Sequence, residues 1–329
     1  MRPVHAGRSH VLIVSSGVDE ATDVVSKTLT ARGATVTRLN TEQFPFSDTW
    51  TSRISTKGRE FRSLVQTSDS PAVDLGTVGS IWYRRVRVPP RPDAMNPGVY
   101  DYCLRESRAT LLGGLLAQSG RIMSAPEAIW RAEHKLLQLS VALLAGLSVP
   151  DTVVTNDPRE VREAFARFNG QMIGKPVRSG YVDLGQEQMA IFTSQILAEH
   201  LALVDRAQVS PVIYQRLIPK EYDIRVTIVG DKMFVAEIDS QSDPDASIDW
   251  RRTTNPSLPH RRGTLPEGVR DALYRLMNSL GLAFGAIDLV RTPDGAYVFL
   301  EINPNGQWLW LDDFLDLGIS DAVSNWLLS

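Results

Sequence analysis

Cysteine is almost absent from this sequence of 329 residues. Its single cysteine, Cys103, excludes an internal disulfide and a zinc site built from cysteines. We expect Cys103 to pack as a small hydrophobic residue on a helix. Structural disulfides belong to oxidising compartments, so a chain without them is expected in the cytoplasm.

Long apolar runs and a strong charge of one sign are also missing. No stretch approaches the roughly 20 apolar residues that a membrane-spanning helix needs, and residues 1–8 lack the apolar core of a signal peptide. The net charge of -3 argues against general nucleic-acid binding. The P-loop pattern G-x-x-x-x-G-K-[ST] is absent as well. We therefore expect neither a membrane nor a nucleic acid as a partner.

What remains is a globular composition with alternating helix and strand signals. Hydrophobic residues make up 43% and charged residues 22% of the chain, as in folded globular proteins. The length exceeds that of one ordinary core. The order of the signals predicts an α/β (α+β) fold whose mixed sheet ends in antiparallel hairpins. We expect three units, at 1–122, 123–215 and 216–329.

Periodicity and helix-breaking residues predict the individual elements. In the first unit we expect strands at 11–14, 35–39 and 81–83, helices at 19–32 and 99–118, and a polar strand pair at 49–55 and 60–66. Further along we expect helices at 126–145, 267–280 and 312–328, and strands at 172–177, 212–215, 224–229, 233–238, 284–290 and 296–302.

Three oxygen-bearing side chains near the end of the chain are predicted to converge. If Asp294-Gly295 forms a two-residue hairpin loop, Asp288 lies directly opposite Glu301. Asn303 lies two residues further along and shares their face. Two carboxylates at this range repel unless a cation lies between them, and hard oxygen ligands suit Mg²⁺ bound to nucleotide phosphates. The alternative, ordinary solvent-facing strand residues, is less favoured by this register.

Two lysines and a loop are weaker signals. Lys135 is expected on a helix, and Lys175 ends an apolar strand just before Pro176. The segment that follows, through Ser179 and Gly180, can offer backbone N–H groups to phosphates. Taken singly, Lys135 could be a solvated charge and the segment with Ser179 and Gly180 a plain surface loop.

Together these features resemble the ATP-grasp superfamily. The helix lysine in an E-x-K context, the strand lysine in G-K-P, the segment 214–218 and the acidic and asparagine trio occur in that family's order. The resemblance implies an ATP-grasp fold behind an N-terminal pre-ATP-grasp domain, with Mg²⁺ held by Asp288, Glu301 and Asn303. It further implies that ATP is bound by Lys135, Lys175, Ser179, Gly180, Gln215, Arg216, Leu217 and Ile218.

Four segments narrow the resemblance to one group of ATP-grasp enzymes. Residues 81–85 (IWYRR), 220–230 (KEYDIRVTIVG), 249–252 (DWRR) and 301–310 (EINPNGQWLW) are similar to the graspetide synthetases, the microviridin-type peptide maturases. This implies a ligase that phosphorylates Asp or Glu side chains of a ribosomal precursor peptide. A Ser/Thr hydroxyl or Lys amine then attacks, which gives a macrocyclic ester or amide.

Charged residues supply the candidates for catalysis and peptide binding. Guanidinium groups stabilise the charge of an acyl phosphate, and Arg225 and Arg251 are our candidates for that role. For the precursor we expect Glu221 and Asp223 to bind the leader, and Arg84 and Arg85 to face the acidic core. The alternatives are local pairing of Glu221 and protection of an edge strand by the arginines. Self-association as a homodimer is left open.

Other activities on the same fold compete with this interpretation. A ligase for free amino acids or for glutamate addition is the nearest, but such dipeptide ligases carry a P-G-x-T-like segment where this chain has Pro304-Asn305-Gly306-Gln307. A kinase that transfers phosphate to a stable acceptor is another. A nucleotide-binding regulator without turnover is disfavoured by the intact lysines and metal ligands.

Overall fold

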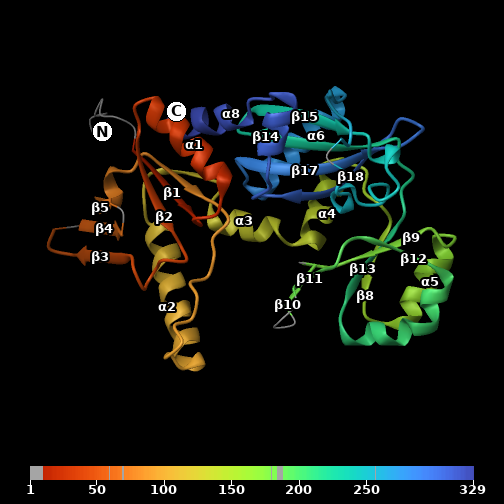
Figure 1. Cartoon of the computed structure of the whole chain (residues 1–329), viewed down its shortest axis with the longest axis horizontal. Helices are drawn as coiled ribbons and strands as arrows, with labels where there is room; N and C mark the ends of the chain where they lie inside the picture. The colour runs from red at the N-terminus through yellow and green to blue at the C-terminus, as the bar shows by residue number, and fades with distance from the viewer. Residues whose placement is uncertain (1–9, 59, 69, 179, 184–187, 256) are drawn as a thin grey trace.

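The structure, a computed structural model, describes residues 10–58, 60–68, 70–178, 180–183, 188–255 and 257–329. The N-terminal part contains a four-stranded sheet of order β2-β1-β6-β7, whose neighbouring strands are parallel (Figure 1). Its strands are β1 (His10–Ser15), β2 (Thr35–Asn40), β6 (Ser80–Tyr83) and β7 (Arg121–Met123). Residues 11–14 are completely buried, as expected for a parallel strand covered on both faces. Helix α1 (Glu20–Ala31) follows β1.

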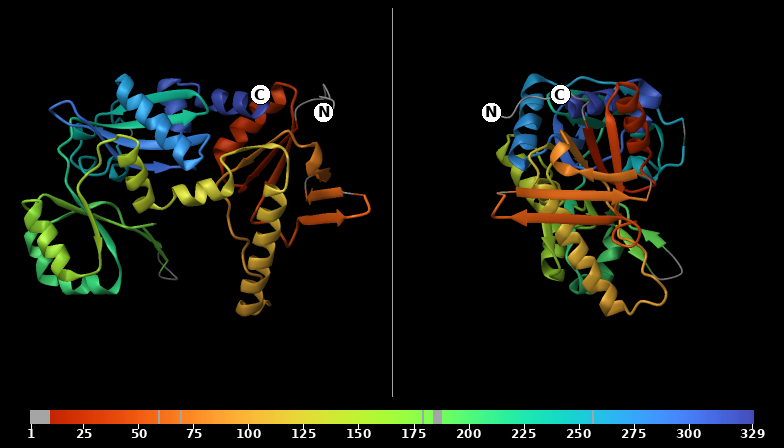
Figure 2. Two further views of the ribbon diagram at one scale, coloured as in Figure 1. Left: turned by 180° about the vertical axis from the view of Figure 1, so that it is seen from behind. Right: turned by 90° about the vertical axis from the view of Figure 1, so that its left-hand side faces the viewer.

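Two extensions lie beside this sheet. The first is an antiparallel sheet of β3 (Thr49–Ser55), β4 (Glu60–Thr67) and β5 (Ser70–Asp74), followed by the short helix η1 (Leu75–Thr77). The second is helix α2 (Pro97–Leu116), which extends away from the parallel sheet (Figures 1 and 2). Asn96 accepts a hydrogen bond from Gly98 N, and Pro97 occupies the first turn, so the start of α2 is encoded locally.

A second four-stranded sheet follows, in the order β12-β9-β13-β8, and all its strand pairs are antiparallel. Its strands are β8 (Thr152–Thr155), β9 (Met172–Lys175), β12 (Ser194–Ile196) and β13 (Val212–Arg216). Helices α5 (Pro158–Arg167) and η2 (Ala198–Val209) contribute to its core, which includes Phe168 and Tyr214. A hairpin of β10 (Tyr181–Asp183) and β11 (Gln188–Ala190) lies beside it.

The third sheet has five antiparallel strands in the order β16-β15-β14-β17-β18. Its strands are β14 (Tyr222–Val229), β15 (Lys232–Ile238), β16 (His260–Arg262), β17 (Phe284–Arg291) and β18 (Tyr297–Asn303). Side chains of α4 (Lys135–Leu144) and α6 (Glu267–Leu280) join one buried cluster with this sheet. Those of α7 (Leu309–Leu315) and α8 (Ile319–Leu328) join another. Between β15 and β16 lie η3 (Ser240–Ser242) and η4 (Trp250–Arg252).

The first and third sheets share a core, although they come from opposite ends of the chain (Figures 1 and 2). Trp82 of β6 lies 6.0 Å from Trp308, measured between ring centroids. On the surface, Arg32, which directly follows α1, donates to Asp321 at 2.5 Å and to Asn325 at 2.8 Å, both on α8. The N-terminal sheet therefore packs directly against the third sheet.

Two predicted helices are each interrupted. The helix expected at 126–145 is divided into α3 (Pro126–Ala132) and α4, and Gln138 Nε2 caps the end of α3 by donating to Ala132 O at 2.5 Å. The helix expected at 312–328 is divided into α7 and α8, because Asp316 and Gly318 adopt left-handed backbone angles with φ 47° and 76°. The other predicted helices and strands are present within a few residues of the expected positions.

Within the described part of the chain, none of the helices combines the length and apolar character needed to cross a bilayer. The unit boundaries after 122 and 215 stay predictions.

Candidate active site

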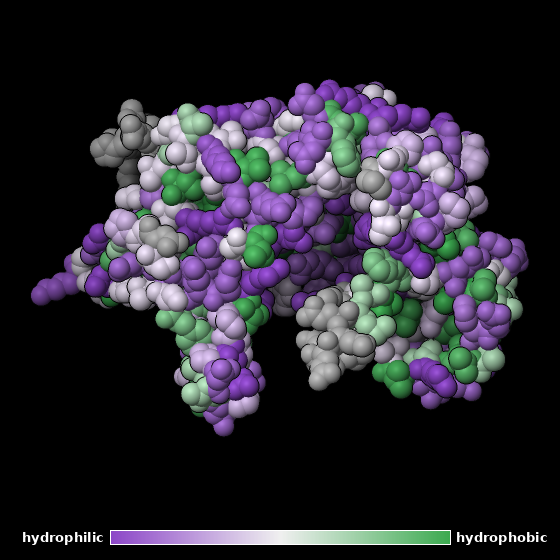
Figure 3. All heavy atoms as spheres, in the orientation of Figure 1, coloured by the Kyte–Doolittle hydropathy of each residue, from purple (hydrophilic) through white to green (hydrophobic). Residues whose placement is uncertain are grey.

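A cavity lies between the second and third sheets and is lined by both. The second sheet contributes Ile173 and Lys175 of β9 and Gln215 of β13. From the other side come Asp288 of β17, Glu301 of β18, and the loop that carries Arg251. The molecular surface is hollowed beneath the third sheet, with mainly hydrophilic residues around the hollow (Figure 3).

The two predicted carboxylates face each other as expected, since Asp288 pairs with Glu301 in the β17–β18 register. The loop prediction was wrong, however. Thr292 N donates to Ala296 O, so the turn is longer than Asp294-Gly295. The register then shifts between Asp288 and Leu289, and this irregularity compensates for the longer turn. The opposition of the two carboxylates is thus preserved.

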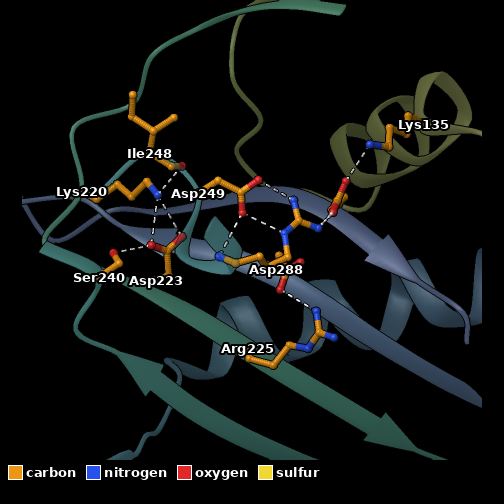
Figure 4. Close-up of polar contacts among 10 residues, drawn as sticks. Lys135, Lys220, Asp223, Arg225, Ser240, Ile248, Asp249 and Asp288 are labelled. Atoms are coloured by element: carbon orange, nitrogen blue, oxygen red, sulfur yellow. Dashed lines mark hydrogen bonds and ion pairs between the residues drawn. The ribbon is translucent and has the colours of Figure 1, made fainter. Parts of the chain in front are cut away.

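Each carboxylate has cationic partners (Figure 4). Arg225 of β14 reaches Asp288 Oδ1 at 2.7 Å. Glu301 is contacted by Lys135 Nζ at 3.1 Å and by Arg251 Nη1 at 3.2 Å. Both predicted arginines therefore reach the acidic pair, each at a different member. Asn303 pairs with Ala286 in the same sheet, and its Oδ1 accepts from Asn305 N at 2.9 Å.

The position of Lys135 is informative in itself. It is the first residue of α4, where a cation opposes the helix dipole. Its contact with Glu301 compensates for this unfavourable placement. The ion pair therefore holds the ammonium group of Lys135 beside Glu301, which lines the cavity.

Electrostatics in the cavity keep Glu301 ionised, whereas burial works against the charge of Lys175. Burial alone would raise the pKa of Glu301, but Lys135, Lys175 and Arg251 outweigh it and lower the pKa to about 2. For Lys175, burial lowers the pKa to about 8, while Glu301 partly opposes that change. The cavity is thus a dense, nearly balanced set of opposite charges.

The loop that carries Arg251 is held by two residues that sequence reasoning missed. Asp249 accepts from Arg251 Nε at 2.8 Å and Nη2 at 3.0 Å, a two-pronged contact that directs the guanidinium toward Glu301. Lys220 Nζ donates to Ile248 O at 2.9 Å (Figure 4). The close D-x-R spacing was the available sequence signal for the contact of Asp249 with Arg251. No local pattern marks the contact of Lys220 with Ile248 O.

Asp223 does not lie where a leader segment could contact it. Only 4% of it is exposed, and its carboxylate accepts from Lys220 Nζ at 3.0 Å and from Ser240. It lines the cavity instead, and burial raises its pKa despite the nearby lysine. Glu221 forms an ion pair with Arg291, a residue distant in sequence, and not with Lys220 or Arg225, the partners expected in the local alternative.

Arg84 also departs from both of its predicted roles. It follows β6, an internal strand of the first sheet rather than an edge, and it is completely buried. Its Nε contacts Asp19 Oδ2 at 2.8 Å, so it cannot form an exposed track for an acidic peptide. Arg85 is exposed, with φ 41°, and remains available for that role.

At the other end of the cavity, the predicted adenine segment contributes four lining residues, namely Gln215, Arg216, Leu217 and Ile218. Gln215 Nε2 donates to Thr152 Oγ1 at 2.8 Å, whereas its buried Oε1 has no hydrogen-bond partner among the described residues. Arg216 is held by Asp151 at 3.0 Å. Gly180 follows β9 and accepts from Ile191 N at 2.5 Å, while Ser179 lies outside the described residues.

Comparisons with known proteins place this arrangement in a class. Residues 10–125 match the family model described as the MvdD pre-ATP grasp domain. The tetrahydromethanopterin:alpha-L-glutamate ligase of Methanocaldococcus jannaschii is 24% identical over 207 residues, which are 61% of this chain and 68% of that protein. Human N-acetylaspartylglutamate synthase A is 24% identical over 232 residues, which are 68% of this chain but only 56% of the human protein. The chain is an ATP-grasp ligase with a pre-ATP-grasp domain.

Two solved structures define the family more narrowly. The macrocyclase MdnC from Microcystis aeruginosa, bound with the precursor peptide MdnA, has a TM-score of 0.85 and 33% identity over 96% of this chain and 98% of that one. The macrocyclase MdnB from the same organism has a TM-score of 0.80 and 31% identity over 97% and 99%. The chain belongs to the family of ATP-grasp macrocyclases that includes MdnC and MdnB.

Proposed function

We propose that this ligase uses ATP and Mg²⁺ to activate side-chain carboxylates of a ribosomal precursor peptide. The activated carboxylate is then joined to a Ser/Thr hydroxyl or Lys amine of the same peptide as a macrocyclic ester or amide. The observation that carries the proposal is the opposed pair Asp288 and Glu301, surrounded by Lys135, Lys175, Arg225 and Arg251. Similarity to MdnC, a macrocyclase bound with its precursor peptide, supports the peptide substrate.

The residues present fit Mg²⁺ and a nucleotide. Asp288, Glu301 and Asn303 offer hard oxygen donors, and Mg²⁺ usually takes one or two carboxylates together with substrate phosphates. Each carboxylate has lone pairs beyond those used by its cationic partners, one for Asp288 and two for Glu301. At the other end, the unpaired Oε1 of Gln215 suits an N–H donor such as the amino group of adenine. Mg²⁺ at this position would neutralise phosphate charge and orient the transferred phosphoryl group.

The roles of the cations follow from their positions. Lys135 and Lys175 would hold nucleotide phosphates. In the first step a peptide carboxylate oxygen bonds to the terminal phosphorus of ATP, and ADP leaves. Arg225 and Arg251 would then stabilise the negative charge of the acyl phosphate and of the tetrahedral species after it. In the second step the hydroxyl or amine attacks the carbonyl carbon, and phosphate leaves with the proton that the nucleophile loses.

Two exposed residues, Arg85 and Glu221, are our candidates for peptide recognition. Arg85 is our remaining candidate for contact with the acidic core, because it is exposed while Arg84 is not. Glu221 is our remaining candidate for contact with the leader, because Asp223 is buried. Because ATP and newly made peptides are cytoplasmic, we propose that the enzyme acts in the cytoplasm.

Mass spectrometry of a peptide after incubation with the enzyme, ATP and Mg²⁺ tests the proposal. The substrate is a short precursor peptide rich in Thr, Asp and Glu, and the Glu301→Gln variant serves as the inactive control. Loss of one water per bond, with equal release of ADP, is the expected result. Gain of a phosphate would indicate a kinase instead, and gain of a free amino acid an amino-acid ligase like the glutamate-adding relatives.

A further inference from the structure

Arg84 lies buried at the junction of the first sheet and the turn after β18. Its Nη2 donates to Gln307 Oε1 at 2.8 Å and its Nη1 to Gly306 O at 3.2 Å. These contacts cross from the N-terminal sheet to a turn that begins directly after Asn303. A buried guanidinium is costly unless its donors are satisfied, so its contacts with this turn are specific rather than incidental.

Arg84 is itself held in place by contacts within the N-terminal part of the chain and with Trp308. Asp19 Oδ2 contacts Arg84 Nε at 2.8 Å and also accepts from Ser15 Oγ at 3.0 Å, at the end of β1. The guanidinium carbon lies 4.4 Å from the ring centroid of Trp308. Burial lowers the pKa of Arg84 to about 10, so the group stays charged at neutral pH.

Arg225 holds the same turn from the other side. Its Nη2 donates to Gln307 O at 3.3 Å, while its Nη1 reaches Asp288 Oδ1 at 2.7 Å. A Cβ added at Gly306 would lie 3.2 Å from Arg225 Nη2 and 2.4 Å from the Cβ of Ala286. Residues 306–307 are therefore wedged between Arg84 on one side and β17 with Arg225 on the other.

We propose that Arg84 is a positioning residue, which acts through Gln307 to fix the turn that orients Arg225 toward Asp288. The inference rests on the proposed function, in which Arg225 stabilises the acyl phosphate. It assigns the N-terminal sheet a part in turnover, because its buried arginine orients the guanidinium that contacts Asp288 at the wall of the cavity. Misplacement of a catalytic group by about 1 Å can cost about a hundredfold in rate.

The Gln307→Met variant tests this link without leaving a buried charge alone, because the pair of Arg84 and Asp19 remains. With the same precursor peptide as substrate, we expect kcat to fall roughly tenfold. KM for ATP and the melting temperature should stay at wild-type values, a split that a merely structural role would not give. Gln307→Glu keeps an acceptor oxygen for Arg84, and its kcat should stay within about threefold of wild type.

A double-mutant cycle with Arg225 decides whether the effect passes through that residue. In an Arg225→Ala background, Gln307→Met should cause no further loss of kcat, because there is no guanidinium left to misplace. The control is Arg32→Gln, which removes a contact between α1 and α8 away from the turn and should leave kcat unchanged.

Three outcomes would overturn the positioning role: a wild-type kcat in Gln307→Met, a full additional loss in the Arg225→Ala background, or a loss equally caused by Arg32→Gln. The failure of the proposed function looks different. A wild-type enzyme that releases no ADP and forms no cross-linked peptide contradicts the macrocyclase activity itself, whatever the variants do.

Discussion

Asp288 and Glu301 lie directly opposite each other on β17 and β18, and within the described residues they form ion pairs with different cations. Arg225 contacts the first at 2.7 Å, and Lys135 contacts the second at 3.1 Å. Opposed carboxylates would otherwise repel, and one would take up a proton. Because each is paired separately, Glu301 stays ionised and both can offer oxygen atoms to a metal.

Replacement of Asn303 tests the metal assignment with the least structural damage. Asn303 is exposed, so Asn303→Ala leaves no buried charge unpaired. We expect the Mg²⁺ concentration for half-maximal activity to rise by at least about tenfold, as on loss of a metal's outer partners. Activity measured against Mg²⁺ concentration checks this, with Asp321→Asn on the distant α8 as a control. Equal Mg²⁺ dependence in all three proteins would contradict the assignment.

Lys175 predicts a pH dependence. Its pKa is lowered to about 8, so the free enzyme loses this positive charge as the pH rises through that value. A neutral lysine binds phosphate poorly, so kcat/KM for ATP should fall above about pH 8. Lys175→Met should show a low kcat/KM without this alkaline decline. A decline of the same shape in the variant would mean that another group titrates.

Arg251 and lysine should not be interchangeable. The guanidinium contacts Asp249 through two nitrogens and Glu301 through a third, a geometry that an ammonium cannot reproduce. Arg251→Lys should therefore lower kcat about a hundredfold, the loss typical of a removed transition-state donor. Calorimetry should show ATP affinity near that of the wild type. Unchanged kcat would show that Arg251 does not contact the reacting groups.

Gly306 should be intolerant of even a methyl group. A Cβ there would lie 2.4 Å from the Cβ of Ala286, so Gly306→Ala should destabilise the fold by about 1–3 kcal/mol through overpacking. A Cβ added at Gly113 of α2 would meet none of the described residues within 4 Å, and Gly113→Ala should instead stabilise by about 0.5–1 kcal/mol. Thermal unfolding of both variants checks the contrast. Equal effects would contradict the close packing of the turn.

Local sequence signals determined a large part of the fold and of the acidic pair. Alternation in β17 and β18, with a turn between them, predicted that Asp288 would face Glu301, and the structure agrees. The length of the turn between β17 and β18 was predicted wrongly. The turn is longer than two residues, the register shift between Asp288 and Leu289 compensates for it, and no residue pattern marks either feature. The break before Lys135 was missed for a similar reason, since Gln138 caps α3 from the following helix.

The sequence by itself determined most of the elements and the ATP-grasp order of the site residues. The contact of Asp249 with Arg251 has a local signal in its D-x-R spacing but was not predicted. Only the tertiary structure decided the roles of Arg84 and Asp223. Arg84 contacts residues 65, 222 and 223 positions away, and Asp223 is satisfied by Ser240 from a different segment. Whether a charged side chain is buried or exposed depends on partners that the fold brings together, and such partners leave no periodic trace near the residue itself.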